Sequence, residues 1–155
     1  MTKFARSWEG PMPKGDKNTL KKLIADQHSE LINQWNRLNE ILLPVKNNPE
    51  TMAHNPQYLS IVKTVAYQIK MLKTNVDDFI NQFGPNELLE EGKQQIYPIA
   101  YLKGNLDSYW DTTDLPGKTM REMIEKNDIP ALAFLFIKIF QQEHQEKKGW
   151  LKKQR

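Results

Sequence analysis

Cysteine is absent from all 155 residues of the sequence. Its absence excludes disulfides, thiolate metal sites and cysteine nucleophiles together. A chain without disulfides fits a reducing compartment, so we expect a cytoplasmic location. Hydrophobic residues make up 39% of the chain and charged residues 26%, which is typical of a globular protein that folds rather than stays disordered.

The sequence also lacks a long apolar segment. The longest run of low charge, from Ile129 to Phe140, covers 12 residues, whereas a helix needs about 20 to span a bilayer. No apolar run follows Lys3 and Arg6 near the N-terminus, so no secretory signal is visible. We therefore expect no membrane span.

Motifs for metal, nucleotide or nucleophilic chemistry are missing as well. His28, His54 and His144 are isolated, and none belongs to an HExxH or HxH pattern. The segment LPGKT ends like a phosphate-binding loop, but Thr112 stands where that loop needs its first glycine. No GxSxG elbow is present. We expect no metal, no cofactor and no catalytic residue, hence a protein that is not an enzyme.

Carboxylates gather loosely in two places, which are Glu87, Glu90 and Glu91, and then Asp107, Asp111 and Asp114. Paired acids can act as acid and base if burial separates their pKa values. Their spacing here is that of helix surfaces, and we interpret both groups as solvated faces.

Helical periodicity is the strongest signal that is present. Asp16 is a candidate N-cap, and a first amphipathic helix is predicted over residues 17–44. A second is predicted over 57–83, where apolar residues alternate at four- and three-residue steps until Gly84 and Pro85. This seam consists of Tyr58, Val62, Val65, Ile69, Leu72, Val76, Phe79 and Phe83. The connector is short, so the two helices predict a long antiparallel hairpin.

Shorter helices are predicted to pack across this hairpin. They cover residues 86–110, broken by Gly92, Pro98 and Gly104, then 119–127 after a capping box from Thr119 to Glu122, and 129–148 after Asp128. The last of these is expected to touch the hairpin through Phe134, Ile137 and Phe140, although Phe134 to Phe140 also permits a strand. The fold class is all-α, with an extended arm over 1–16, a single helical domain over 17–149 and a basic tail over 150–155.

Charge is segregated along the chain. Residues 1–22 and 138–155 each carry six basic and two acidic residues, whereas residues 23–137 carry a net charge of −5. Basic ends can attract nucleic acid or an acidic protein, or can simply be solvated. The possible nucleic-acid contacts are Lys14, Lys17, Lys21, Lys22, Lys147, Lys148, Lys152, Lys153 and Arg155.

Aromatic residues supply candidates for protein contacts, because tyrosine and tryptophan join apolar area to a polar group. Tyr97 and Tyr101, four residues apart, can instead cover the hairpin. The candidate partner-binding residues are Phe4, Trp8, Tyr97, Tyr101, Tyr109, Trp110 and Trp150. The sequence predicts a non-catalytic adaptor, chaperone-like or assembly protein that binds a protein partner or itself; the alternative is a nucleic-acid-binding accessory protein that uses its basic termini.

Overall fold

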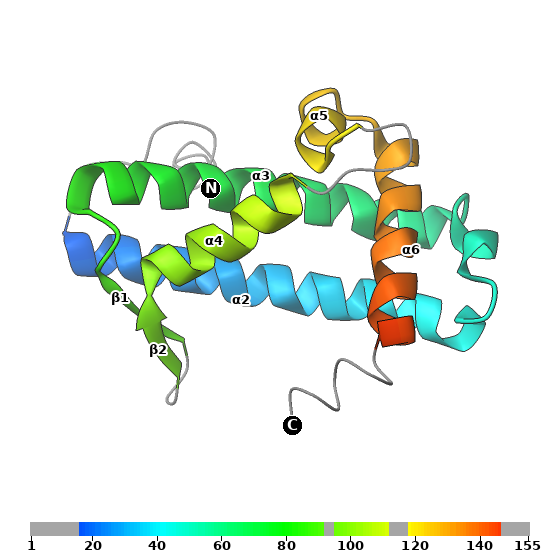
Figure 1. The fold of residues 1–155 in the computed structure, drawn as a ribbon, viewed down its shortest axis with the longest axis horizontal. Helices are drawn as coiled ribbons and strands as arrows, with labels where there is room; N and C mark the ends of the chain where they lie inside the picture. The colour runs from blue at the N-terminus through cyan, green and yellow to red at the C-terminus, as the bar shows by residue number, and fades with distance from the viewer. Residues whose placement is uncertain (1–15, 92–94, 112–117, 147–155) are drawn as a thin grey trace. The chain divides into compact units, whose positions relative to one another are not determined.

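The computed structural model describes residues 16–91, 95–111 and 118–146. Its two long helices form the predicted hairpin, and shorter helices and one small two-stranded sheet complete the all-α fold (Figure 1). The elements are α2 (Lys17–Leu42), η1 (Leu43–Val45), η2 (Pro49–Met52), α3 (Pro56–Phe83), β1 (Leu88–Glu91), β2 (Gln95–Pro98), α4 (Ile99–Trp110), α5 (Met120–Glu125) and α6 (Ile129–Glu146). Apart from Asp16, the predicted arm and tail lie outside the described residues.

Local sequence fixes where the two long helices begin and end. The Asp16 carboxylate accepts the Thr19 backbone N–H at 3.2 Å, which confirms the predicted N-cap of α2. Asn55 plays the same role for α3 by accepting the Tyr58 N–H at 3.1 Å. Gly84 ends α3 with a φ of 88°, a left-handed conformation that glycine adopts without a steric cost.

The heptad seam of α3 is buried as predicted. Tyr58, Val62, Val65, Leu72, Val76 and Phe79 have no exposed side-chain surface, and Ile69 retains 5%. Only Phe83, in the last turn, is half-buried. A regular apolar stripe of this length could be read from sequence because all its members face one side of the helix.

The chain divides into two compact units, each built from two separate stretches of sequence. The first unit comprises Met1–Asn33 and Tyr67–Asp111, and the second comprises Gln34–Ala66 and Thr112–Arg155. Both long helices therefore contribute residues to each unit.

In the first unit, the early turns of α2 pack against the late turns of α3, and α4 packs against α3. The core includes Ile24, Leu72, Phe79, Leu89 and Leu102. One polar pair is buried among them, since the Asn75 amide donates to the Gln27 side-chain oxygen at 3.0 Å.

In the second unit, α6 contributes Leu132, Phe136 and Phe140 to the core, and all three are fully buried. The Trp35 ring meets the Phe136 ring edge-on at 5.3 Å. The Tyr58 hydroxyl donates to the Ala133 carbonyl at 2.7 Å. The predicted capping box of α5 is confirmed, because Thr119 and Glu122 each accept the other's backbone N–H.

The helical prediction for residues 86–110 is wrong in its first half. Residues 88–91 and 95–98 form an antiparallel ribbon, and helix begins only at Ile99. Pro98 cannot donate the hydrogen bond that a helix interior requires. A helix would also place Glu87 and Glu90 on one face, whereas in the structure Glu87 precedes β1 and Glu90 lies within it.

The expectation for Phe134 is also wrong. Its side chain is 49% exposed and meets the His54 ring edge-on at 6.1 Å, while Ile137 and Phe140 are buried as predicted. The neighbouring Phe136 takes the core position. A segment as apolar as Phe134 to Phe140 does not show by itself which side faces outward.

Candidate protein-binding surface

The ribbon presents one apolar face to solvent. Its register pairs Leu88 with Pro98 and Glu90 with Ile96, so these four side chains share a face. Leu88 is 50% exposed and Ile96 61% exposed, whereas Leu89, on the opposite face, is fully buried. We call Leu88, Glu90, Ile96 and Pro98 the ribbon face. Three of the four side chains of the ribbon face are apolar and lie next to one another, whereas single exposed apolar residues are common on any protein surface.

An aromatic pair lies where β2 meets α4. The Tyr97 and Tyr101 rings meet edge-on with centroids 5.7 Å apart. The Tyr97 hydroxyl also lies 3.2 Å from His28 Nδ1 on α2, which fixes its ring against the hairpin. Tyr101 is 63% exposed. Tyr97 therefore covers the hairpin, as one of the two interpretations predicted, whereas Tyr101 offers its ring to solvent.

Tyr109 and Trp110 lie in the last turn of α4, about 12 Å along the helix axis from Tyr101. Tyr109 is exposed, and Trp110 is half-buried with the Lys73 ammonium 5.8 Å from its ring centroid. This distance is typical of a cation–π contact. The four tyrosine and tryptophan candidates of this segment therefore form two separate groups at the two ends of one helix.

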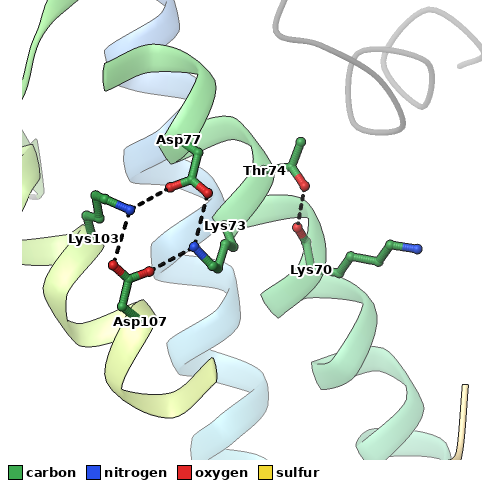
Figure 2. Close-up of polar contacts among 6 residues, drawn as sticks. All are labelled: Lys70, Lys73, Thr74, Asp77, Lys103 and Asp107. Atoms are coloured by element: carbon green, nitrogen blue, oxygen red, sulfur yellow. Dashed lines mark hydrogen bonds and ion pairs between the residues drawn. The ribbon is translucent and has the colours of Figure 1, made fainter. Parts of the chain in front are cut away.

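Four charged side chains form a closed ring of ion pairs between α3 and α4, as Figure 2 shows. Lys73 lies 3.0 Å from Asp77 and 2.8 Å from Asp107. Lys103 lies 3.0 Å from Asp77 and 3.1 Å from Asp107. Each carboxylate thus binds two ammonium groups and each ammonium binds two carboxylates, so the ring joins α4 to α3.

The electrostatics of this ring favour ionised carboxylates. Partial burial acts to raise the pKa of Asp107, but hydrogen bonds from Lys73 and Lys103 outweigh it and hold the pKa below its ordinary value. Hydrogen bonding to Asp77 is the main cause that raises the pKa of Lys103. A general acid at neutral pH needs a raised carboxyl pKa, so Asp107 has the opposite of the required property.

Three lysines predicted as possible nucleic-acid contacts have carboxylate partners within the chain. Lys17 and Lys21 lie 3.0 and 3.6 Å from Glu87, and Lys22 lies 3.8 Å from Asp26. The hydrogen bond from Lys17 is the main cause that holds the pKa of Glu87 below its ordinary value. Any phosphate that bound here would compete with Glu87 for Lys17 and Lys21.

The histidines contact aromatic rings or a carbonyl rather than one another. His54 faces Phe134, and His144 lies against the Phe140 ring with its Nδ1 2.9 Å from the Phe140 carbonyl oxygen. In the part of the chain that the structure describes, no three histidine or carboxylate side chains gather closely enough to hold a metal ion.

Several predicted candidates lie outside the described residues. They are Phe4, Trp8, Lys14, Lys147, Lys148, Trp150, Lys152, Lys153 and Arg155, and also Asp114 among the carboxylates. Sequence reasoning missed Leu88 and Ile96, because it placed both on a helix. Neither LLEE nor QIYP alternates apolar and polar residues, so the sequence carries no period-two signal for either strand.

None of the helices within residues 16–146 that the structure describes is long and apolar enough to cross a membrane. A scan against protein-family models, a search of curated proteins and a search of solved structures each found no match to this chain.

Proposed function

We propose that this chain is a non-catalytic helical adaptor or assembly protein that acts through protein–protein contacts. The observation that carries the proposal is the ribbon face, where Leu88, Ile96 and Pro98 stand side by side in solvent. Contiguous exposed apolar side chains beside a charged residue are typical of interaction sites. The exposed Tyr101 ring adds a side chain of the kind that anchors interfaces.

The rigidity of the surrounding unit supports the same function. Leu89 anchors the ribbon in the core, the Tyr97 hydroxyl meets His28, and the ion-pair ring joins α4 to α3. A surface held in this way loses little conformational entropy when it binds a partner. We also place the protein in the cytoplasm as part of this proposal, since the chain contains no cysteine.

Affinity capture with three forms of the full chain tests this function. The wild type should retain one or more specific proteins from a native extract. The double variant Leu88→Ser/Ile96→Ser should lose them, while the control Thr64→Ser, an exposed position on α3, should retain them. Light scattering after size exclusion gives the oligomeric state. A chain that stays monomeric and retains the same proteins with and without the ribbon face contradicts the proposal.

Nucleic-acid binding is the alternative, and the segregated basic ends favour it. The discriminating measurement is a mobility shift with single- and double-stranded nucleic acid at low salt. Binding that disappears when the lysines of residues 147–153 become alanine would support this alternative. A chain that shifts neither form of nucleic acid at low salt eliminates it.

A further inference from the structure

A groove of about 450 Å³ runs beside β1 in the first unit. One stripe of α2 lines one side, including Lys21, Lys22, Asp26 and Ser29, and β1 lines the other through Leu88 and Glu90. The α2 residues that line it extend from Asn18 to Ser29, about 16 Å at the helical rise. An extended peptide of four or five residues has the same length.

The backbone of β1 is unpaired along this groove. The Ile99 N–H donates to the Glu87 carbonyl at 2.8 Å, and with the register this makes Leu89 and Tyr97 the hydrogen-bonded pair. The N–H and C=O groups of Leu88 and Glu90 therefore point away from β2. In the part of the chain that the structure describes, no backbone group pairs with them. Such an edge is a template for another strand.

The charge of the edge selects what can pair with it. Within the described residues Glu90 has no ion-pair partner, and Leu88 is half exposed beside it on the same face. A second copy of β1 would place its own Glu90 either opposite the apolar Leu88 or opposite Glu90, and like charges across a strand pair are destabilising. A strand with a basic residue opposite Glu90 and an apolar residue opposite Leu88 meets no such repulsion.

We infer that the outer edge of β1 binds an extended peptide of a partner protein as a third strand, with a lysine or arginine beside Glu90 and an apolar side chain beside Leu88. The peptide's backbone bonds to Leu88 and Glu90, and the α2 stripe forms the wall of its groove. In antiparallel pairing the recognition pattern reads basic, any residue, apolar. This inference rests on the proposed protein-binding function and names the chemistry of the partner.

The test is a titration of the full, isotopically labelled chain with the capped peptide Thr-Val-Lys-Thr-Ile-Thr, followed by amide NMR. We expect the Leu88 and Glu90 amides to shift and to exchange more slowly with solvent, together with shifts at Lys21 and Ser29. Two N-methylated peptides supply matched controls. Methylation of the amides that face β1 should weaken binding about tenfold, and methylation of the alternate amides should leave it unchanged.

Reversing the charge at position 90 tests the predicted ion pair between Glu90 and the peptide. Glu90→Lys should weaken binding of the lysine peptide about fivefold and should strengthen binding of a peptide with glutamate at that position. Equal effects of the two N-methylated peptides, or shifts that map elsewhere, overturn the inference. Concentration-dependent shifts of Leu88 and Glu90 without peptide overturn it too, because they assign the edge to a second copy. If affinity capture succeeds while these titrations fail, the inference falls and the proposed function stands.

Discussion

At the scale of single residues, Tyr58 combines deep burial with one polar contact. Its ring lies in the core of the second unit, and its hydroxyl donates to the Ala133 carbonyl at 2.7 Å. Burial raises the pKa of this hydroxyl above its ordinary value of 10.0. The side chain therefore acts both as a core residue and as a link between α3 and α6.

Tyr58→Phe should lower the free energy of unfolding by about 1 kcal/mol at pH 7, because a buried hydrogen bond is lost while the ring stays. Above pH 10 the Tyr58 hydroxyl ionises in the unfolded chain before it does in the folded one, so the free energy of unfolding of the wild type falls as pH rises. The difference in unfolding free energy between wild type and Tyr58→Phe should therefore narrow. Urea unfolding at pH 7 and at pH 10.5 measures both. The control is Tyr101→Phe on an exposed ring, which should change the free energy of unfolding by less than about 0.5 kcal/mol. If both variants lose the same free energy, the Tyr58–Ala133 hydrogen bond is not the cause of the loss.

Asn127 is the described non-glycine residue with a positive φ, of 54°. It ends α5, since its N–H donates to the Ile124 carbonyl at 3.0 Å and the Asp128 N–H donates to the Met123 carbonyl at 2.8 Å. These two bonds form a Schellman motif, whose left-handed residue is commonly glycine.

Asn127→Gly should therefore be neutral or stabilise the protein by about 0.5 kcal/mol, and Asn127→Ala should destabilise it by about 1 kcal/mol. Thermal unfolding of the three chains gives the order. The control is Lys126→Ala at the preceding residue, which is right-handed and exposed. The prediction fails if alanine and glycine at position 127 have the same stability.

At the scale of elements, the contact between α2 and α3 includes a polar pair inside an apolar seam. Asn75 donates to Gln27, but among the described residues Gln27 Nε2 and Asn75 Oδ1 have no hydrogen-bond partner. Unpaired buried polar atoms cost free energy, and the cost grows when one member of a pair is removed.

Asn75→Leu alone should lower the free energy of unfolding by about 2 kcal/mol, because the buried Gln27 side-chain oxygen loses its hydrogen-bond donor. The double variant Gln27→Met/Asn75→Leu should recover most of that loss or exceed the wild type, because both polar groups leave together. A double-mutant cycle by urea unfolding measures the coupling. Simple additivity of the two single changes would show that the pair is not an energetic unit.

The ion-pair ring makes the link between α3 and α4 dependent on pH. Since the pKa of Asp107 is lowered, its contribution is present above its ordinary value of 3.8 and is lost as pH falls through the folded value. The pKa of Lys103 is raised, so its contribution is present below 10.5 and is lost as pH rises through the folded value.

Asp107→Asn should cost about 1 kcal/mol at pH 7, which is modest because the ring is partly exposed and screened by water. The difference from wild type should shrink as pH falls below 3.8, and it should also shrink in high salt. Asp111→Asn, an exposed position that follows the same helix, provides the control and should change the free energy of unfolding by less than about 0.5 kcal/mol at pH 7. A pH-independent loss for Asp107→Asn would mean that it acts through packing rather than charge.

Elements that repeat a signal over many residues can be predicted from the sequence. The stripe of α3 from Tyr58 to Phe79 spans several turns, and Asp16 and Thr119 each supply a short-range capping signal that is independent of the rest of the fold. The ribbon could not be predicted, because each strand has only four residues and its partner alone decides between strand and helix. The ion-pair ring could not be predicted either, since Lys73 and Asp107 are far apart in sequence.

At the scale of the whole molecule, both long helices belong to two units. Residues 17–42 of α2 and 56–83 of α3 each continue across the boundary between the units. A helix that melts in one unit loses the hydrogen bonds that support its next turns, so unfolding in one unit should propagate into the other.

We therefore expect one cooperative unfolding transition. Trp35 belongs to the second unit and Trp110 to the first, so each reports on one unit once the other three tryptophans are replaced by phenylalanine. The replacements change the stability of each chain, so each chain is compared with itself. In each single-tryptophan chain, the urea midpoint from tryptophan fluorescence should equal the midpoint from circular dichroism. Midpoints that differ between fluorescence and circular dichroism of the same chain would contradict this expectation.

The same division has a consequence for synthesis of the chain. The first unit is complete once residue 111 has emerged from the ribosome, but the second lacks its entire α6 until the last stretch follows. During that interval the Trp35 ring lacks its Phe136 neighbour, and the Tyr58 hydroxyl lacks the Ala133 carbonyl, both of which α6 supplies. Since the two units are expected to fold together, a nascent chain at this stage exposes apolar side chains that are buried in the folded protein, and such a chain is a substrate for chaperones.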